Sequence, residues 1–479
     1  MKFYTNVSLK GGVVTIRGWN FGERINQKIK YEPTFYLPTQ KQSEYKTVEG
    51  QFVEPMKFDS IREARDFAQK YDEVENFKIY GSTLFQYCCL NEEYGNEYDP
   101  EKVRTVNIDI EVGSEEGFPE PELANQPVTA ITMSYRGRYY VLGVGEYNNT
   151  RDDVVYARCR SEHELLSKFL TMWRKIDADI VTGWNVEFFD IPYLVRRMNK
   201  ILGEDETKRL SPLFDIRERR IKKHNKELLE YELIGMQVLD YLELYRKFTY
   251  TQQESYRLDH IGHVELGVKK LDYSEVETLH QLYKTDYQKF IDYNIRDVEI
   301  VDQLEDKMKL IEMALAIAYD AKVNYGDVFT QVRMWDVLIH NYLLKSKVVV
   351  PPKESTRKDS QYAGAYVKPP QVGMHGWLMS FDLNSLYPHL IMQYNISPET
   401  FVKDQYVDMS VDKILDKKVD IEYDGLCLTP GGHFFRKDKQ GFLPEMMQRM
   451  YDERKLYKKK MLEAQNELEE VNRLLNGQA

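Results

Sequence analysis

The sequence is poor in cysteine and has no long apolar run. Its four cysteines (Cys88, Cys89, Cys159 and Cys427) show no Cys-x-x-Cys spacing. We therefore expect reduced structural thiols rather than disulfides or structural zinc. No apolar stretch approaches the roughly 18 residues of a membrane span, and residues 1–5 lack the apolar core of a secretory signal. These absences predict a soluble intracellular protein that does not enter a membrane.

An excess of positive charge is absent as well. The 66 lysines and arginines are outnumbered by 77 aspartates and glutamates, which gives a net charge of −11. This balance argues against a uniformly basic surface that binds nucleic acid. It leaves local grooves open, because binding depends only on the cations that face the phosphates. A surplus of carboxylates also suits a nuclease that binds metal ions, so charge alone leaves the partner undecided.

The order of the expected elements indicates a mixed α/β domain over residues 105–309. The expected strands cover residues 103–112, 130–135, 139–143 and 179–185. Residues 161–175 are typical of a helix, with Ser161 as N-cap and Glu164 forming a capping box. Residues 276–318 are expected to be mostly helical.

Four carboxylates in this region follow a pattern that could bind metal. Asp109 and Glu111 lie two apart on one strand, so both side chains leave the same face. Asp190 follows the next strand and turn, and Asp297 shares a helix face with Tyr293, four residues earlier. Four such carboxylates can hold two divalent ions about 3.5–4 Å apart, the geometry that cleaves phosphodiesters. Each motif taken singly is more often a solvated surface.

Taken together, these segments resemble the DEDDy-type 3′–5′ exonucleases. Gly183-Trp184-Asn185, with Asp190 five residues after Asn185, is a specific part of the match. The resemblance implies an RNase H-like domain in which Asp109, Glu111, Asp190 and Asp297 bind two Mg²⁺ or Mn²⁺ ions. It also implies that Tyr293 orients the attacking water, that Asn185 contacts DNA, and that single-stranded 3′ ends are the substrate.

A second constellation begins at Asp382, with the sequence Asp-Leu-Asn-Ser-Leu-Tyr-Pro. It is similar to the first catalytic motif of the family B DNA polymerases. A strand would deliver Asp382 to a metal, with Leu383 as a further metal-binding position. The following turn would expose the backbone N–H groups of Ser385, Leu386 and Tyr387 to a nucleoside triphosphate. The alternative interpretation is a strand end with a buried tyrosine.

Two further segments extend the same resemblance. Tyr362 and Gly364 match the element that joins exonuclease to palm and contacts the template strand. Arg454 and Lys458 lie one helical turn apart, as do the fingers residues that reach the phosphates of the incoming nucleotide. By itself such a basic run is usually a solvated face that pairs with glutamates one turn on.

The resemblance reaches along nearly the whole chain, and the T-even-like bacteriophage group of the family is the nearest match. It implies primer-template DNA and dNTPs as substrates, in the cytoplasm of an infected bacterial host. The implied domains are an N-terminal domain (1–104, completed by about 310–353), an exonuclease (105–309), a partial palm (354–440) and the first half of the fingers (441–479).

Two motifs of that family, a Lys-x6–7-Tyr-Gly helix and an Asp-Thr-Asp hairpin, are absent from the sequence. Asp382 without a second carboxylate should not support synthesis. We therefore expect the N-terminal subunit of a split polymerase, completed by a second chain that carries the remaining palm, fingers and thumb. That chain would also contact any sliding clamp. It would cover the apolar stripe of Met461, Leu468, Val471 and Leu475. The alternatives are a truncated form acting only as an exonuclease, or a nucleic-acid-binding translational regulator.

Overall fold

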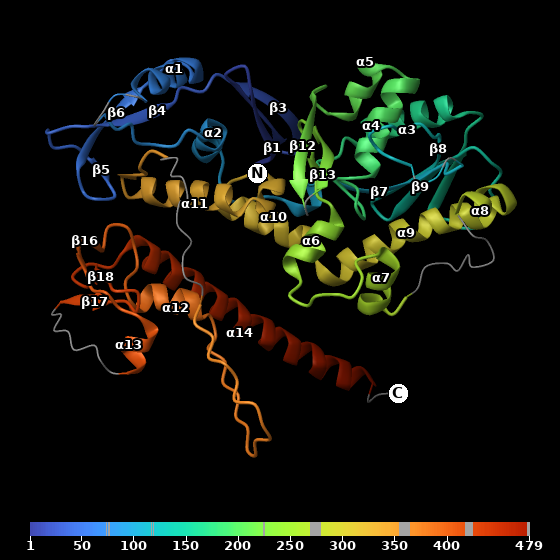
Figure 1. The fold of residues 1–479 in the computed structure, drawn as a ribbon. Helices are drawn as coiled ribbons and strands as arrows, with labels where there is room; N and C mark the ends of the chain where they lie inside the picture. Colours follow the sequence, from blue (N-terminus) through green and yellow to red (C-terminus); the bar gives the residue numbers. More distant parts are fainter. Residues whose placement is uncertain are drawn as a thin grey trace. The chain divides into compact units, whose positions relative to one another are not determined.

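The computed structural model describes residues 1–72, 74, 77–115, 117, 119–223, 226–268, 279–353, 365–416 and 425–476 (Figure 1). The chain forms two compact units. The first unit comprises Met1–Phe35, Met56–Phe77 and Ser82–Tyr342, and the second comprises Tyr36–Pro55, Lys78–Gly81 and Leu343–Ala479. The four domain boundaries expected from the sequence stay predictions. No helix among the described residues is both long enough and apolar enough to cross a membrane.

The first unit begins with an antiparallel sheet in the order β1-β2-β3. Its strands are β1 (Lys2–Lys10), β2 (Val13–Asn20) and β3 (Glu23–Ile29), and the helices α1 (Ile61–Tyr71) and α2 (Phe85–Glu93) follow. Ser60 caps α1, since its side chain accepts a hydrogen bond from the Glu63 N–H. Tyr4 donates to the carbonyl oxygens of Ala318 and Val323, so the end of α10 (Leu310–Ala321) packs on this sheet.

A six-stranded mixed sheet forms the centre of the first unit. Its strands are β7 (Thr105–Val112), β8 (Val128–Tyr135), β9 (Arg138–Gly143), β10 (Val154–Arg158), β11 (Ile180–Thr182) and β14 (Gln237–Val238). They lie in the order β10-β9-β8-β7-β11-β14. The β7-β8 and β8-β9 pairs are antiparallel and the other pairs are parallel. The predicted hairpin and the predicted mixed α/β domain are confirmed.

Helices cover both faces of this sheet. They are α3 (Glu162–Ile176), α4 (Asp190–Ile201), α5 (Glu204–Thr207), α6 (Tyr241–Phe248), α7 (Leu258–Leu266), α8 (Leu279–Thr285) and α9 (Tyr287–Met308). Ile108 and Ile110 of β7 are buried in one core with residues of α3 and α4. On the other face, Ala130 of β8 packs with Phe290 and Ile295 of α9. The alternation of a strand therefore turns the polar residues of β7 toward α9.

The predicted helix over 161–175 is confirmed as α3, but its capping box is not. The Ser161 side chain accepts from the Glu164 N–H at 3.3 Å, as predicted for an N-cap. The Glu164 carboxylate accepts from the Arg160 N–H at 2.9 Å, one residue before the expected donor. It also pairs with the Arg160 guanidinium at 2.9 Å, and this ion pair holds the carboxylate beside Arg160, the residue before the N-cap.

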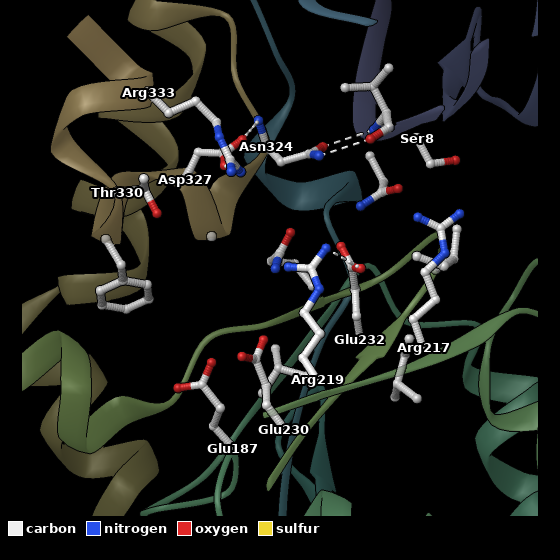
Figure 2. A pocket seen from close by; sticks show the side chains of 18 of the residues that line it. Ser8, Glu187, Arg217, Arg219, Glu230, Glu232, Asn324, Asp327, Thr330 and Arg333 are labelled. Carbon is white, nitrogen blue, oxygen red and sulfur yellow. Dashed lines mark hydrogen bonds and ion pairs between the residues drawn. The ribbon is translucent and has the colours of Figure 1, made fainter. Parts of the chain in front are cut away.

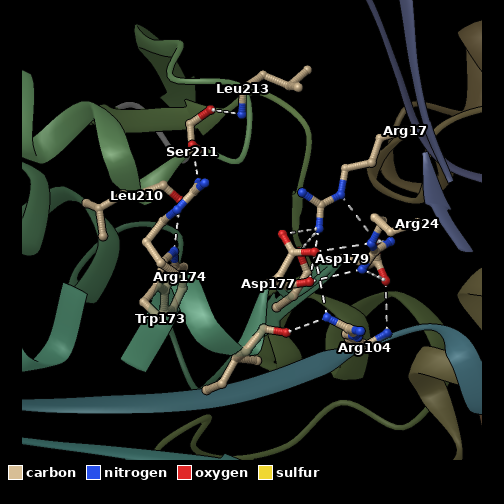
Figure 3. A network of polar contacts seen from close by, with 12 residues as sticks. Arg17, Arg24, Arg104, Trp173, Arg174, Asp177, Asp179, Leu210, Ser211 and Leu213 are labelled. Carbon is tan, nitrogen blue, oxygen red and sulfur yellow. Dashed lines mark hydrogen bonds and ion pairs between the residues drawn. The ribbon is translucent and has the colours of Figure 1, made fainter. Parts of the chain in front are cut away.

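A polar network joins the β1-β2-β3 sheet to the turn before β11 (Figure 3). Arg17 and Asp179, both at most 1% exposed, approach to 3.5 Å. Arg24 donates to both oxygens of Asp179, at 2.5 and 3.1 Å, and the Arg104 N–H donates to Asp179 at 3.0 Å. Asp177 accepts from Arg17 at 3.0 Å and from Arg24 at 3.2 Å. Burial, followed by the charge of Arg24, lowers the pKa of Arg17.

The remaining elements of the first unit are a long hairpin, β12 (Ile216–Lys223) and β13 (Lys226–Leu233), and short helical turns. The turns are η1 (Pro100–Lys102), η2 (Lys208–Leu210) and η3 (Tyr325–Phe329). Helix α11 (Gln331–Lys345) continues from the first unit into the second.

The described residues of the second unit form two small sheets and the helices α12 to α14. Strands β4 (Thr34–Pro38), β5 (Tyr45–Thr47), β6 (Phe52–Lys57) and β15 (Val348–Val349) lie in the order β15-β5-β6-β4. Strands β16 (Phe401–Tyr406), β17 (Leu426–Leu428) and β18 (His433–Arg436) are antiparallel. The helices are α12 (Leu386–Gln393), α13 (Val411–Leu415) and α14 (Phe442–Asn476). The His389 and Tyr451 rings meet edge to face at 4.7 Å, which packs α12 on α14.

The strand expected to deliver Asp382 is not formed, and that prediction is wrong for this structure. Residues 365–384 contain no helix or strand. Met374 and Trp377 are fully exposed and Phe381 is 85% exposed. A strand requires a hydrogen-bonded neighbour, and none of the described strands pairs with this segment. The alternative interpretation, a strand end with a buried tyrosine, is also wrong, since Tyr387 is 75% exposed.

Candidate active site

The site is built on the polar face of β7. Asp109 and Glu111 lie opposite Thr132 and Ala130 of β8, at alternate positions of the ladder. Their side chains therefore project from the face of the sheet that α9 covers. Ile108 and Ile110 project from the opposite face, into the core. The predicted shared face of the two carboxylates is confirmed by this register.

Gly183 brings the next strand close to β7. Thr182 of β11 pairs in parallel with Asn107 of β7. A Cβ atom on Gly183 would lie 2.4 Å from the carbonyl oxygen of Ile108, so a larger residue would push the two strands apart. Asn185 then adopts a left-handed backbone with φ of 65°. The chain can thereby turn directly from β11 toward α4.

Asp240 holds this turn, although it was not among the residues predicted to be functional. Its carboxylate accepts from the N–H groups of Asn185 and Glu187, both at 3.0 Å, and it also caps α6 through the Leu242 N–H. The side chain is 1% exposed. Removing it would leave three donors without this acceptor, and each buried unsatisfied donor costs about 1–3 kcal/mol. Asp240 is therefore a positioning residue for the segment that carries Asp190.

Asp190 begins α4 and lies against β7. Its Oδ1 accepts from the Ile110 N–H at 3.0 Å, between the two carboxylates of that strand, and the side chain is 3% exposed. Burial raises the pKa of Asp190 to about 7, and the charges of Asp240 and Asp297 add to the rise. The negative charge of Asp297 on α9 therefore acts on the carboxyl group of Asp190 on α4.

Helix α9 completes the site from the other side. Asn294 donates through Nδ2 to Asp109 Oδ2 at 2.6 Å, and its Oδ1 accepts from the Thr132 hydroxyl. Tyr293 and Asp297 are each 7% exposed. Asn294 was not predicted as a functional residue, although it shares a helix face with Asp297, three residues later. It fixes the position of Asp109 relative to the helix that carries Tyr293 and Asp297.

The residues present fit divalent cations by their chemistry. All the candidate ligands are carboxylates, the donors that Mg²⁺ prefers. Asp190 and Asp297 are buried and their like charges repel each other, so a bound cation would offset this repulsion. No group of three or more His, Cys, Asp or Glu side chains in the described ranges has the arrangement of a metal site. The full ligand set thus stays a prediction.

The candidate polymerase residues lie in the second unit. Asp382 and Leu383 are exposed on the irregular segment before α12. Ser385 is the N-cap of α12 with φ of 54°, and Leu386 and Tyr387 form its first turn, where backbone N–H groups lack helical acceptors. Tyr362 and Gly364 lie outside the described residues.

Arg454 and Lys458 are exposed on α14, one turn apart as predicted. Their neighbours Arg449 and Lys459 approach glutamates one turn on, at 3.9 and 3.7 Å. Neither Arg454 nor Lys458 has an ion pair within the part of the chain that the structure describes.

A large cavity of about 1040 Å³ lies beside the turn that leads to α4 (Figure 2). Residues from β1, the β12–β13 hairpin, η3 and α11 line it, and none of the five exonuclease candidates does so. Several of its charged residues already pair: Arg219 with Glu232 at 2.8 Å and Arg333 with Asp327 at 2.8 Å. Its size alone does not make it the site of chemistry, because the candidate carboxylates lie elsewhere.

Comparison with protein families gives two matches along the chain. Residues 63–261 match the exonuclease domain of DNA polymerase family B, and residues 324–478 match DNA polymerase family B. The first match includes β7, the turn at Gly183 and Asp190. The second includes the Asp382 segment and the whole C-terminal portion of the second unit, Leu343–Ala479, except its last residue.

Individual relatives agree with these matches. The DNA-directed DNA polymerase of Escherichia phage RB69 is 33% identical over 95% of this chain and 53% of its own length. That of Enterobacteria phage T4 is 30% identical over 99% of this chain and 56% of its own. A DNA polymerase of Pyrococcus glycovorans is 25% identical over 77% of the chain and 44% of its own. The chain spans about half the length of the two phage relatives.

Proposed function

Because the chain belongs to DNA polymerase family B, we propose that its first unit is a 3′–5′ exonuclease that removes nucleotides from single-stranded DNA ends. The observation that carries the proposal is the meeting of β7, α4 and α9. Asn294 donates a hydrogen bond to Asp109, and the Ile110 N–H donates one to Asp190. The charge of Asp297 also acts on Asp190. The sheet order, with β8 antiparallel to β7, supports the RNase H-like architecture predicted for this domain.

Each site residue has a proposed role. Asp109, Glu111, Asp190 and Asp297 would hold two Mg²⁺ or Mn²⁺ ions, which activate water and stabilise the leaving oxygen of a phosphodiester. The hydroxyl of Tyr293, four residues before Asp297 on α9, would orient the attacking water. Asn185, on the turn held by Asp240, would contact the DNA strand.

Metal removal tests this proposal. Purified protein in Mg²⁺ buffer is expected to shorten a 3′-unlabelled, 5′-labelled single-stranded oligonucleotide stepwise, because the carboxylates need cations to act on phosphates. Excess EDTA should abolish the shortening, and added Mg²⁺ or Mn²⁺ should restore it. An oligonucleotide with a blocked 3′ end is the control substrate. Equal shortening in EDTA, or of the blocked substrate, would contradict a metal-dependent 3′–5′ exonuclease.

We further propose that the second unit contributes part of a polymerase site for primer-template DNA and dNTPs. Asp382 and Leu383 would bind a metal, and Ser385, Leu386 and Tyr387 would face the triphosphate at the start of α12. Arg454 and Lys458 would reach its phosphates, which their lack of glutamate partners supports. Tyr362 and Gly364 would contact the template. The phage relatives also support action in the cytoplasm of an infected bacterium.

We propose that DNA synthesis requires the polypeptide that corresponds to the rest of these relatives. Met461, Leu468, Val471 and Leu475 are between 49% and 65% exposed on α14, an apolar stripe that such a chain would cover. A clamp, if one is bound, would be contacted through that chain.

Primer extension tests this requirement. The protein alone is expected to give no extension of a labelled primer with dNTPs, because Asp382 lacks a second metal-binding carboxylate. Extension should appear when a polypeptide with the Asp-Thr-Asp motif, corresponding to the other half of the phage relatives, is added. Extension by the chain alone would overturn this requirement.

A further inference from the structure

Three polar residues of β7 alternate along the face that α9 covers: Asn107, Asp109 and Glu111. The last two are candidate metal ligands, whereas the proposed chemistry gives Asn107 no role. Asn107 is 4% exposed. A buried amide needs partners, because burying a polar group without hydrogen bonds costs free energy. The partners of Asn107 therefore show what it does on this face.

Asn107 bonds to α9 rather than to its own sheet. Its Nδ2 donates to the backbone carbonyl of Val298 at 2.9 Å and to Asp302 Oδ1 at 2.8 Å. Both amide hydrogens are thereby used. Val298 directly follows Asp297 in the chain. The first of these bonds therefore ties β7 to the helix backbone beside a candidate metal ligand.

Asp302 is the centre of a wider contact between the sheet and α9. Asn107 of β7, Ser134 of β8 and Tyr139 of β9 are in register across the three strands, so their side chains share one face. All three form hydrogen bonds with the Asp302 carboxyl group. Burial raises the pKa of this group, and the three hydrogen bonds oppose the rise. We call these four residues the α9 clamp.

A second contact between the sheet and α9 lies two residues further along β7. Asp109 is opposite Thr132, and Asn294 of α9 bridges the two, donating to Asp109 and accepting from Thr132. Asn294, Val298 and Asp302 are spaced four residues apart, so they lie along one face of α9. The sheet therefore holds this face of the helix at three successive turns.

The two contacts together restrict α9 more than either contact alone. Eight residues separate Asn294 from Asp302, which is about 12 Å of helix at 1.5 Å per residue. A helix held only at Asn294 could still tilt or turn about that point, and Tyr293 and Asp297 would move with it. The α9 clamp removes this freedom, because it holds the same face of the helix two turns further on.

We propose that Asn107 and Asp302 are positioning residues of the exonuclease. They fix the rotation and tilt of α9, and thereby the places of Tyr293 and Asp297 relative to the carboxylates of β7. This inference rests on the proposed exonuclease function and extends it to two residues that are not among the proposed ligands. Both residues act through the helix.

Asn107→Ala and Asp302→Ala test the proposal, since they cut the α9 clamp from the sheet side and from the helix side. Each is expected to lower kcat on single-stranded DNA roughly tenfold or more, because a misplacement of about 1 Å can cost 10²-fold in rate. KM for the DNA should not change, because neither residue is a proposed DNA contact. Calorimetry without DNA should show Mn²⁺ binding weakened roughly tenfold, the usual effect of losing a residue that orients a metal ligand.

Asp302→Asn is the conservative variant. It keeps an oxygen that can accept from Asn107 but removes the negative charge. It should therefore retain most of the parent kcat and Mn²⁺ affinity, which separates a positioning role from a direct effect of the charge.

Asn324→Ala is the matched control. The Asn324 side chain exchanges two hydrogen bonds with the backbone of Val7 on β1, both at 2.8 Å, so this variant also loses a bond from an asparagine amide to a backbone carbonyl in the first unit. Neither β7 nor α9 takes part in that contact. Its kcat and Mn²⁺ affinity should match those of the parent, and circular dichroism should show every variant folded.

Three results would overturn the positioning role: parent kcat and Mn²⁺ affinity in the alanine variants, equal losses in Asn324→Ala, or a loss in Asp302→Asn as large as in Asp302→Ala. If Asn107→Ala does not fold, Asp302→Ala decides the matter from the helix side. Failure of the parent chain itself to degrade DNA would refute the proposed function, whereas an active parent with unchanged variants refutes only the positioning role.

Discussion

Replacing Asp109 and Glu111 together with alanine is expected to slow the degradation of single-stranded DNA 3′ ends roughly 10³-fold or more. The two side chains share the face of β7 that meets α9, and Asp109 is held there by Asn294. Metal-assisted stabilisation of a phosphoryl transfer is worth several kcal/mol, and each 1.36 kcal/mol changes a rate tenfold. Initial rates on a 5′-labelled oligonucleotide measure the loss.

Two exposed residues of α5 give the matched control. Asp205→Ala with Glu206→Ala likewise removes one aspartate and one glutamate side chain. These two carboxylates lie on a surface helix and pair only with the lysine and arginine beside them. This variant should keep the parent rate. Circular dichroism should show both double variants folded. Unchanged degradation by the Asp109 and Glu111 variant would refute the site assignment.

Asp179→Ala is expected to lower the free energy of unfolding by about 3–5 kcal/mol, the typical cost of breaking a buried ion pair. Arg17 is 1% exposed, and its burial together with the charge of Arg24 already lowers its pKa. Without Asp179, the positive charges of Arg17 and Arg24 would be less well compensated. The Arg104 N–H would also lose its acceptor. Equilibrium unfolding in denaturant, followed by fluorescence, measures the change.

Asp177→Ala is the comparison, since it belongs to the same network but its side chain is 30% exposed. We expect a smaller loss, because Arg17 and Arg24 would keep Asp179 and water can solvate the site. A loss below about 1 kcal/mol for Asp179→Ala, or equal losses for the two variants, would show that burial does not govern this network.

Residues close in sequence were the predictable part of the site. The two-residue spacing of Asp109 and Glu111 places both on one strand face, and the four-residue spacing of Tyr293 and Asp297 places both on one helix face. Asn294 and Asp240 escaped prediction because their partners are remote: Asn294 bonds Asp109 across 185 residues, and Asp240 bonds Asn185 across 55. The local sequence does not reveal the remote partner of either residue.

The Asp382 segment is the opposite case, because its local sequence resembles a motif but its backbone conformation was predicted wrongly. Its residues resemble a catalytic motif, but whether they form a strand depends on a neighbouring strand that pairs with them. In the described part of the second unit no strand does so, and Phe381 and Tyr387 stay exposed. For this segment, the resemblance to a motif therefore does not determine the conformation of the backbone.

By itself the amino-acid sequence determined the periodic spacing, the N-cap at Ser161 and the chemical nature of the candidate ligands, since covalent geometry sets which near neighbours share a face. Only the tertiary structure decided that β7, α4 and α9 meet, that Asp190 lies in the field of Asp297, and that Arg17 is buried on Asp179. The reason is physical. Burial and electrostatic fields depend on distances between remote segments, and those distances arise from packing the whole unit.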